Sequence, residues 1–224
     1  MTLLIGSLDL GLIYGILALG VYISFRILKI ADLTVEGSFV LGMAATTMLT
    51  ASGHPIAGLA AALALGALAG TTTGILQTKL MINPILSGII VMTGLYTVNI
   101  GIMGGKANIP ILGNETIFNA SSNRTVTAFL IALMITMAIS IFFKTRLGLA
   151  IRGTGDNEEM VRASAIDSDL TKCIALALGN SLVALSGGLI AQYQQFSDVG
   201  SGSGIVVIGL ASVIIGEVLL GKRG

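Results

Sequence analysis

Few side chains in this sequence could carry out catalysis or bind a metal. It contains one histidine, His54, in a Gly/Pro turn, and one cysteine, Cys173, which has no second cysteine to pair with. Nucleophilic catalysis needs a nucleophile beside a base, and a metal site needs several ligands. Residues 216–223 imitate a phosphate-binding loop, but Arg223 stands where that loop requires Ser or Thr. The sequence therefore predicts no enzyme, no metal site and no cofactor.

Carboxylates in apolar surroundings are the second group that could do chemistry. Asp9, Asp32, Glu36 and Glu217 lie inside or beside long apolar runs. Charged side chains are costly in a bilayer and often mark ion or proton pathways. One hypothesis is therefore an ion-coupled carrier or channel that uses these carboxylates.

Two of these carboxylates have a helical spacing. Asp32 and Glu36 are four residues apart and share one face of a helix, with Thr34 offset from them. Two interpretations remain open. Either the pair lines a transport pathway, or both are interfacial residues neutralised by Arg26 and Lys29.

The densest group of charges lies in residues 144–172. This stretch holds five of the twelve Lys and Arg residues and five of the eleven Asp and Glu residues. Apolar runs of membrane-spanning length flank it on both sides. Such a loop must lie in water, and residues 158–165 at its centre favour a short helix.

The composition places these groups in a membrane protein. Hydrophobic residues make up 54% of the chain and charged residues 10%, with a mean hydropathy of +0.95. This leaves too little polar surface to cover a soluble globule. We predict an all-α polytopic bundle of about seven transmembrane helices. The expected spans are residues 3–25, 33–51, 56–78, 85–103, 126–143, 174–191 and 205–220.

Basic residues orient the bundle, because they are retained on the cytoplasmic side. With the N-terminus outside, ten Lys and Arg residues lie inside and two outside, and the opposite orientation reverses this count. The ten are Arg26, Lys29, Lys79, Lys144, Arg146, Arg152, Arg162, Lys172, Lys222 and Arg223; the two are Lys106 and Arg124. The sequence thus predicts a multi-pass cell-membrane protein with residues 144–172 in the cytoplasm and no nucleic-acid partner.

Small and polar residues inside the spans predict packing and a pathway. Gly66, Gly70 and Gly74 repeat at four-residue intervals, as do Gly11 and Gly15, and favour close helix packing. The polar residues that we consider pathway candidates are Thr34, Glu36, Asn99, Asn180 and Ser181.

Two segments are expected on the outer side. Residues 191–204, rich in Gly and Ser, resist a continuous helix and predict a reentrant or broken element. Residues 104–123 form a polar, turn-rich loop that can touch an extracytoplasmic partner. Further on, Glu217 is expected to pair with Lys222.

The charged stretch contains its own helix signal. Asp156 or Asn157 can cap a helix whose acidic first turn suits the positive end of the helix dipole. Met160 and Val161 are then available for contact with another protein. The helix is either a coupling element seated in a partner's cleft or a surface helix lying on the membrane.

Residues 153–167, GTGDNEEMVRASAID, resemble the cytoplasmic coupling segment of permease subunits of ATP-binding-cassette importers of the branched-chain amino acid and ribose type. That family carries Gly-x-Asn before a helix that ends in Ala-Arg-x-x-Gly-Ile-Asp/Asn. The matching residues are Gly155, Asn157, Ile166 and Asp167. Arg162 and Ala163 replace Ala-Arg, and Ala165 stands where Gly is usual, which puts the turn geometry in question. Residues 10–39 are similar to the opening of the subgroup associated with tryptophan or tyrosine uptake.

The resemblance implies one transmembrane permease domain over residues 1–224, with residues 144–172 as its cytoplasmic coupling loop. The implied partners are two ATPase subunits, a second permease copy, a solute-binding protein and the lipid bilayer. The expected solute is a hydrophobic or aromatic amino acid. Such permeases usually continue for one or two more spans. The implied coupling residues are Gly155, Asp156, Asn157, Glu158, Glu159, Met160, Val161, Arg162, Ala163, Ala165, Ile166 and Asp167.

Overall fold

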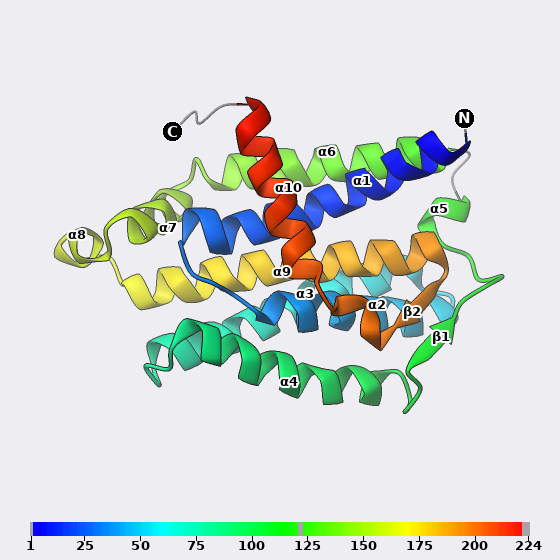
Figure 1. Cartoon of the computed structure of the whole chain (residues 1–224), viewed down its shortest axis with the longest axis horizontal. Helices are drawn as coiled ribbons and strands as arrows, with labels where there is room; N and C mark the ends of the chain where they lie inside the picture. Colours follow the sequence, from blue (N-terminus) through cyan, green and yellow to red (C-terminus); the bar gives the residue numbers. More distant parts are fainter. Residues whose placement is uncertain (1, 121–122, 221–224) are drawn as a thin grey trace.

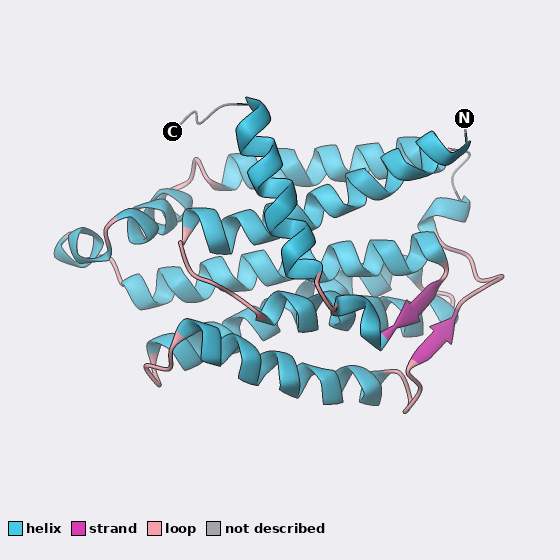
Figure 2. Ribbon diagram, in the orientation of Figure 1, coloured by secondary structure: helices cyan, strands magenta, loops and turns pink. Residues whose placement is uncertain are grey.

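The structure, a computed structural model, describes residues 2–120 and 123–220. Within them the chain folds into a bundle of helices with one two-stranded sheet (Figures 1 and 2). The helices are α1 (Thr2–Val21), the π-helix η1 (Tyr22–Ile27), α2 (Thr34–Ala51), α3 (Pro55–Thr78), α4 (Pro84–Ile102), α5 (Ile117–Ala120), α6 (Arg124–Phe142), α7 (Arg146–Asp156), α8 (Glu158–Ala163), α9 (Ser168–Gln194), the 3-10 helix η2 (Val199–Gly202) and α10 (Ile205–Leu220). The strands are β1 (Asn108–Pro110) and β2 (Phe196–Asp198).

The predicted helical membrane bundle is confirmed. In the described part of the chain, six helices are long and apolar enough to cross a membrane. The helix α2 is not among them, so a seventh span stays a prediction. Its Ser and Thr side chains lie mostly in the interior, where α2 packs against α3, α9 and α4. A helix surrounded by protein does not need the apolar composition of a helix that faces lipid.

The helix α9 is the centre of the bundle. Within its most apolar stretch 78% of the residues are buried, against 6% for α6 at the periphery. The glycines Gly66, Gly70 and Gly74 let α3 approach α9 closely. A Cβ added at Gly66 would lie 2.5 Å from the Asn180 carbonyl oxygen, and one at Gly74 would lie 2.8 Å from the Cys173 Cα. The close packing predicted for this face is confirmed.

The second glycine pair, Gly11 and Gly15 in α1, behaves differently. A Cβ added at either position would meet nothing within 4 Å. Within the described residues this pair makes no close helix contact, because both glycines lie on the exposed face of α1. The close approach of α1 to α9 occurs at Gly20 instead, where a Cβ would lie 2.6 Å from the Gly179 carbonyl oxygen.

Between α9 and α10 the helical path breaks, as predicted, although α9 first continues to Gln194. Beyond the left-handed Gln195, β2 pairs antiparallel with β1, and η2 turns back along α2 (Figure 1). A Cβ at Gly202 would lie 2.5 Å from the Glu36 carbonyl oxygen, and the Gly204 N–H donates to the Glu36 carboxylate at 3.0 Å. The helix α10 therefore begins beside the first turn of α2, inside the bundle.

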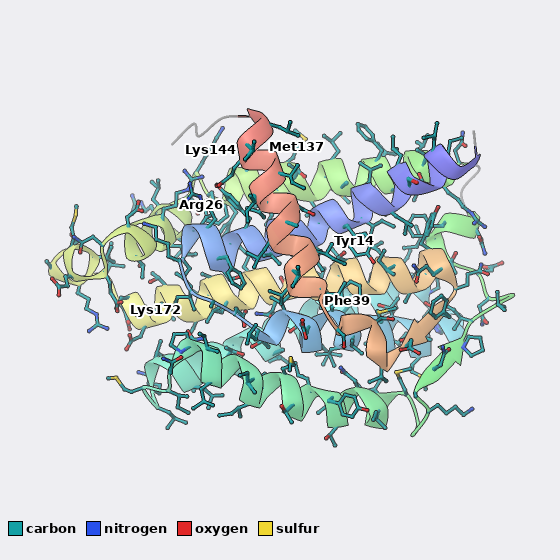
Figure 3. All side chains as sticks on the ribbon, viewed as in Figure 1. Tyr14, Arg26, Phe39, Met137, Lys144 and Lys172 are labelled. Atoms are coloured by element: carbon teal, nitrogen blue, oxygen red, sulfur yellow. The ribbon has the colours of Figure 1, made fainter. Side chains whose placement is uncertain are left out.

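The two ends of the bundle carry different elements. The helices α7 and α8 form one end, which we call the α7–α8 end, while the sheet, α5 and the N-terminus lie at the opposite end (Figure 1). Figure 3 places Arg26, Lys144 and Lys172 toward the α7–α8 end. Lys222 and Arg223, which were predicted to share this side, lie outside the described residues.

Candidate functional site: the coupling segment and the buried polar residues

Two short helices, rather than one, make up the charged segment. The Thr145 hydroxyl caps α7 by accepting from the Gly148 N–H at 3.3 Å. The Asn157 side chain caps α8 by accepting from the Met160 N–H at 3.1 Å, so the capping predicted for Asn157 is confirmed. Asp156, the alternative cap, is instead the last residue of α7.

The segment also ends one turn earlier than predicted. The Asp167 carboxylate accepts from the N–H groups of Asp169 and Leu170, at 2.9 and 3.1 Å, and so begins α9 at Ser168. Lys172, predicted as the last loop residue, lies inside α9. Asp is among the preferred N-cap residues, so Asp167 begins the helix several residues ahead of the apolar run.

Glu158 is the centre of the ion-pair network beneath α8. Its carboxylate accepts from Lys172 Nζ at 2.6 Å, from Arg162 at 2.9 Å and from the Ser168 hydroxyl at 3.1 Å. Arg162 also contacts Asp169 at 3.2 Å. The hydrogen bond from Lys172 is the main cause that holds the pKa of Glu158 below its ordinary value. These bonds fix the short α8 on the first turns of α9.

Ala165 adopts a backbone conformation that favours glycine. Its φ is 59°, in the left-handed region, and its N–H donates to the Arg162 carbonyl as the chain leaves α8. A non-glycine residue here costs about 1 kcal/mol or more. The left-handed turn that glycine would adopt without strain is therefore present here, although Ala occupies the position.

The outer surface of α8 carries exposed apolar side chains. Met160 on α8 is 68% exposed, and Ile166, three residues after α8 ends, is 40% exposed. Val161 is only 7% exposed, and its methyl Cγ2 would lie 3.0 Å from a Cβ at Gly153. The prediction that Val161 is available to a partner is therefore wrong, since it packs α8 onto α7.

A polar hollow of about 390 Å³ opens beside this surface. It lies between the end of α8 and the start of α9, where Ala165 makes its turn. Its lining residues are Arg162, Ala165, Ile166, Asp167, Ser168 and Asp169. The remaining implied coupling residues, Glu159 and Ala163, are also exposed on α8.

The helix α7 connects this surface to the bundle. A Cβ at Gly155 would overlap the Ile27 carbonyl oxygen, so α7 lies directly on the end of η1. Lys29, with a left-handed φ of 58°, donates to Asp156 at 2.8 Å, and this bond lowers the pKa of the Asp156 carboxyl. The hydroxyls of Thr154 and Thr171, 2.7 Å apart, join α7 to α9.

Two pathway candidates, Thr34 and Asn180, meet at Asp32, which is fully buried. The Asp32 carboxylate accepts from the Thr34 N–H at 2.9 Å and from the Asn180 amide at 2.6 Å. The Ser38 hydroxyl donates to the side-chain oxygen of Asn180 at 2.6 Å, and the Thr34 and Thr73 hydroxyls lie 2.7 Å apart. This network ties the start of α2 to α9 and α3.

The remaining pathway candidates do not join this network. Glu36 bonds to Gly204, and the Asn99 amide donates to the Gly37 carbonyl at 3.2 Å. The Asn99 side-chain oxygen is buried and has no hydrogen-bond partner among the described residues. Ser181 bonds to the carbonyl of Leu178 within its own helix.

Neither Asp32 nor Glu36 is neutralised by the bases that precede them. Arg26 pairs with Glu217 at 2.5 Å, and Lys29 pairs with Asp156. The interpretation of neutralised interfacial carboxylates is therefore wrong. The expected partner of Glu217, Lys222, lies outside the described residues.

Comparison with known proteins identifies the family. Residues 3–221 match the model of the branched-chain amino acid transport system permease component family. The chain belongs to this family. It is 39% identical to a tyrosine transport system permease protein of Clostridioides difficile, over 99% of this chain and 75% of that protein. It is 29% identical to the autoinducer 2 import system permease protein LsrC of Escherichia coli, over 86% of this chain and 58% of that protein. No solved structure matches the chain.

The family places the permease among transport components, and its apolar helices make it a multi-pass membrane protein. Sequence reasoning missed three of its contacts: Lys172 with Glu158, Gly155 with Ile27, and Asp32 with Asn180. Only the contact between Lys172 and Glu158 could be predicted from the sequence, because these opposite charges are fourteen residues apart and a turn can bring them together. The other two join residues more than a hundred positions apart.

One further carboxylate of the permease has an incomplete set of hydrogen bonds. Asp9 is 2% exposed, and one of its oxygens accepts from the Tyr193 hydroxyl at 3.1 Å. The other oxygen is buried, and no described residue forms a hydrogen bond with it. Among the described residues, no three His, Cys, Asp or Glu side chains gather to hold a metal ion.

Proposed function

We propose that this permease is the transmembrane subunit of an importer that moves a small solute into the cytoplasm, driven by ATP hydrolysis on separate subunits. The observation that carries the proposal is the pair α7 and α8 at one end of the bundle. Met160 and Ile166 expose apolar side chains there, while the Glu158 network anchors the pair to α9. An exposed apolar surface that is anchored to α9 suits a partner whose conformational changes are transmitted to the bundle.

The proposed route of the movement runs through α7. Binding and hydrolysis of ATP would shift α8, and Gly155 would transmit the shift to η1 because no side chain separates the two backbones. From η1 the movement reaches α10 through the Arg26 and Glu217 ion pair. The segment with Asp32 then connects the start of α2 to α9.

We place the α7–α8 end in the cytoplasm and the N-terminus outside. The excess of Lys and Arg predicted for one side supports this orientation, since bases are retained in the cytoplasm. The sheet of β1 and β2 then lies outside, where it offers a surface to a solute-binding protein. A second permease copy would complete the pathway.

The solute we propose is an amino acid with a hydrophobic or aromatic side chain. The similarity to a tyrosine transport system permease supports this class. The similarity to an autoinducer 2 import system permease is lower, at 29% identity. Uptake of labelled tyrosine and leucine, compared with uptake of labelled glutamate, in vesicles that contain the assembled importer tests the class.

The docking role is tested by Met160→Asp. We expect the variant permease to fold but to lose co-purification with its ATPase, because a charge would replace an apolar contact. The matched control is Met81→Asp, since Met81 is 85% exposed and lies between α3 and α4. Undiminished complex and transport in the Met160 variant would refute the docking role. Equal loss in both variants would point to general damage.

A second candidate function, ion-coupled transport, is favoured by the incomplete hydrogen bonding of Asp9. In that case Asp9 would take up a proton or cation during transport. Uptake in vesicles separates the two functions. ATP-driven import requires trapped ATP, whereas the carrier would follow the proton gradient and ignore ATP.

A further inference from the structure

An apolar groove runs along the outside of the bundle between α3 and α4, with α2 as its floor. Its volume is about 490 Å³. Its lining residues are Leu41, Leu65, Leu68, Ala69, Thr72, Leu76, Ile90, Val91, Gly94, Leu95 and Val98. The one hydroxyl among them, on Thr72, donates to the Leu68 carbonyl at 2.9 Å and presents no unmet polar group to the groove.

The described chain leaves this groove open to its surroundings. Leu68 on α3 is 63% exposed, and Ile90 and Val98 on α4 are 47% and 48% exposed. A Cβ added at Gly94 would meet nothing within 4 Å. In a multi-pass membrane protein, a groove of this composition at membrane depth is filled by apolar groups, because water gains no hydrogen bonds there.

The length of the groove matches one leaflet of a bilayer. On α3 its lining extends from Leu65 to Leu76, which at 1.5 Å per residue is about 16 Å. Half of a hydrocarbon core of about 30 Å is about 15 Å. The groove therefore has the length of a single acyl chain that starts at one face of the membrane.

A basic residue lies just beyond one end of the groove. Lys79 caps the C-terminus of α3, three residues after Leu76, and it is exposed. Among the described residues, no carboxylate forms a salt bridge with Lys79. An ammonium group at this position is placed to pair with an anionic group at the membrane surface.

We propose that the groove between α3 and α4 binds one acyl chain of an anionic phospholipid, with the lipid phosphate at Lys79. The apolar lining, the length of one leaflet and the unpaired base select this occupant. A helix from a second permease copy would fill the groove too, but it would leave Lys79 without a charge partner. The acyl chain fills the space between α3 and α4 and thereby stabilises their arrangement.

The test counts lipids that stay bound to the whole chain. The permease is reconstituted in vesicles of equal parts phosphatidylcholine and phosphatidylglycerol, extracted in mild detergent and weighed by native mass spectrometry. We expect one retained phosphatidylglycerol per chain, preferred about fivefold over phosphatidylcholine, which is the attraction of one Lys to an anionic surface. Lys79→Gln should keep the lipid but lose this preference.

Gly94→Leu fills the groove and should abolish the retained lipid. Gly101→Leu is the matched control, because Gly101 lies two turns further along α4, past the groove, and also has open space at its Cβ. Equal thermal midpoints for the two variants would exclude misfolding. Equal lipid retention in the two variants would overturn the proposal. So would loss of association between differently tagged copies in Gly94→Leu alone, which would assign the groove to a second copy.

Discussion

The contact between α7 and η1 leads to the sharpest prediction. Gly155 faces the Ile27 carbonyl oxygen so closely that a single added methyl group would overlap it. The overlapped atom is a backbone oxygen, so a change of side-chain rotamer cannot relieve the overlap. Gly155→Ala should therefore displace α7 from the end of η1 and weaken the packing that attaches α7 and α8 to the bundle.

The magnitude follows from two opposing effects. Ala favours a helix over Gly by about 1 kcal/mol, which stabilises α7. Overpacking costs about 1 to 3 kcal/mol, and an overlap with a fixed carbonyl belongs at the upper limit. The net loss is then about 2 kcal/mol, or about 4 to 8 °C in the apparent unfolding midpoint of a chain of this size.

The matched control is Gly153→Ala in the same helix. A Cβ at Gly153 would lie 3.0 Å from Val161 Cγ2, the end of a side chain that can shift. Thermal unfolding in detergent should give this control a midpoint equal to or above that of the wild type, and Gly155→Ala a clearly lower one. A Gly155→Ala midpoint at or above the control would refute the close contact.

Three further outcomes are expected. Ala165→Gly should raise the free energy of unfolding by about 1 kcal/mol, measured by chemical denaturation, because φ there is 59°; no gain would contradict the left-handed turn. Asn180→Leu should cost about 2 to 3 kcal/mol, since it removes a hydrogen bond to buried Asp32, and adding Asp32→Asn should restore part of it. The pKa of Glu158 is lowered on folding, so its contribution is complete above about 4.5 and is lost as the pH falls through its folded pKa. A spin label at residue 163 should therefore become mobile in acid, and Lys172→Met should make it mobile at neutral pH; unchanged spectra would exclude the network.

Much of the fold follows from local sequence features. The apolar runs locate α3, α4 and α6 to within about two residues, because membrane-spanning length and composition are properties of a continuous segment. The cap at Asn157 and the break after Gln194 are also local, since they depend on residue types next to each other. The glycine face of α3 was predictable for the same reason.

The side-chain contacts of the candidate site depend on distant partners and could not be predicted in this way. Val161 looks available beside Met160 until α7 folds as a helix and covers it. A sequence with three glycines between residues 148 and 155 does not favour a helix, and α7 forms because it packs on η1 and α9. Likewise the carboxylates nearest to Arg26 in sequence are Asp32 and Glu36, whereas its partner in the fold, Glu217, is 191 residues away.

The burial of α2 against α9 means that the packing of α2 is completed late in synthesis. Its polar side chains are sheltered by α9, yet α9 begins 117 residues after α2 ends. At about 5 to 20 residues per second, a ribosome needs about 6 to 23 s to reach it. During that interval α2 can pack against α3 but not yet against α9. Its threonines and serines must then be shielded by lipid headgroups or by the insertion machinery. The central helix α9 is thus synthesised late, and the first half of the chain cannot complete its packing until α9 has been made.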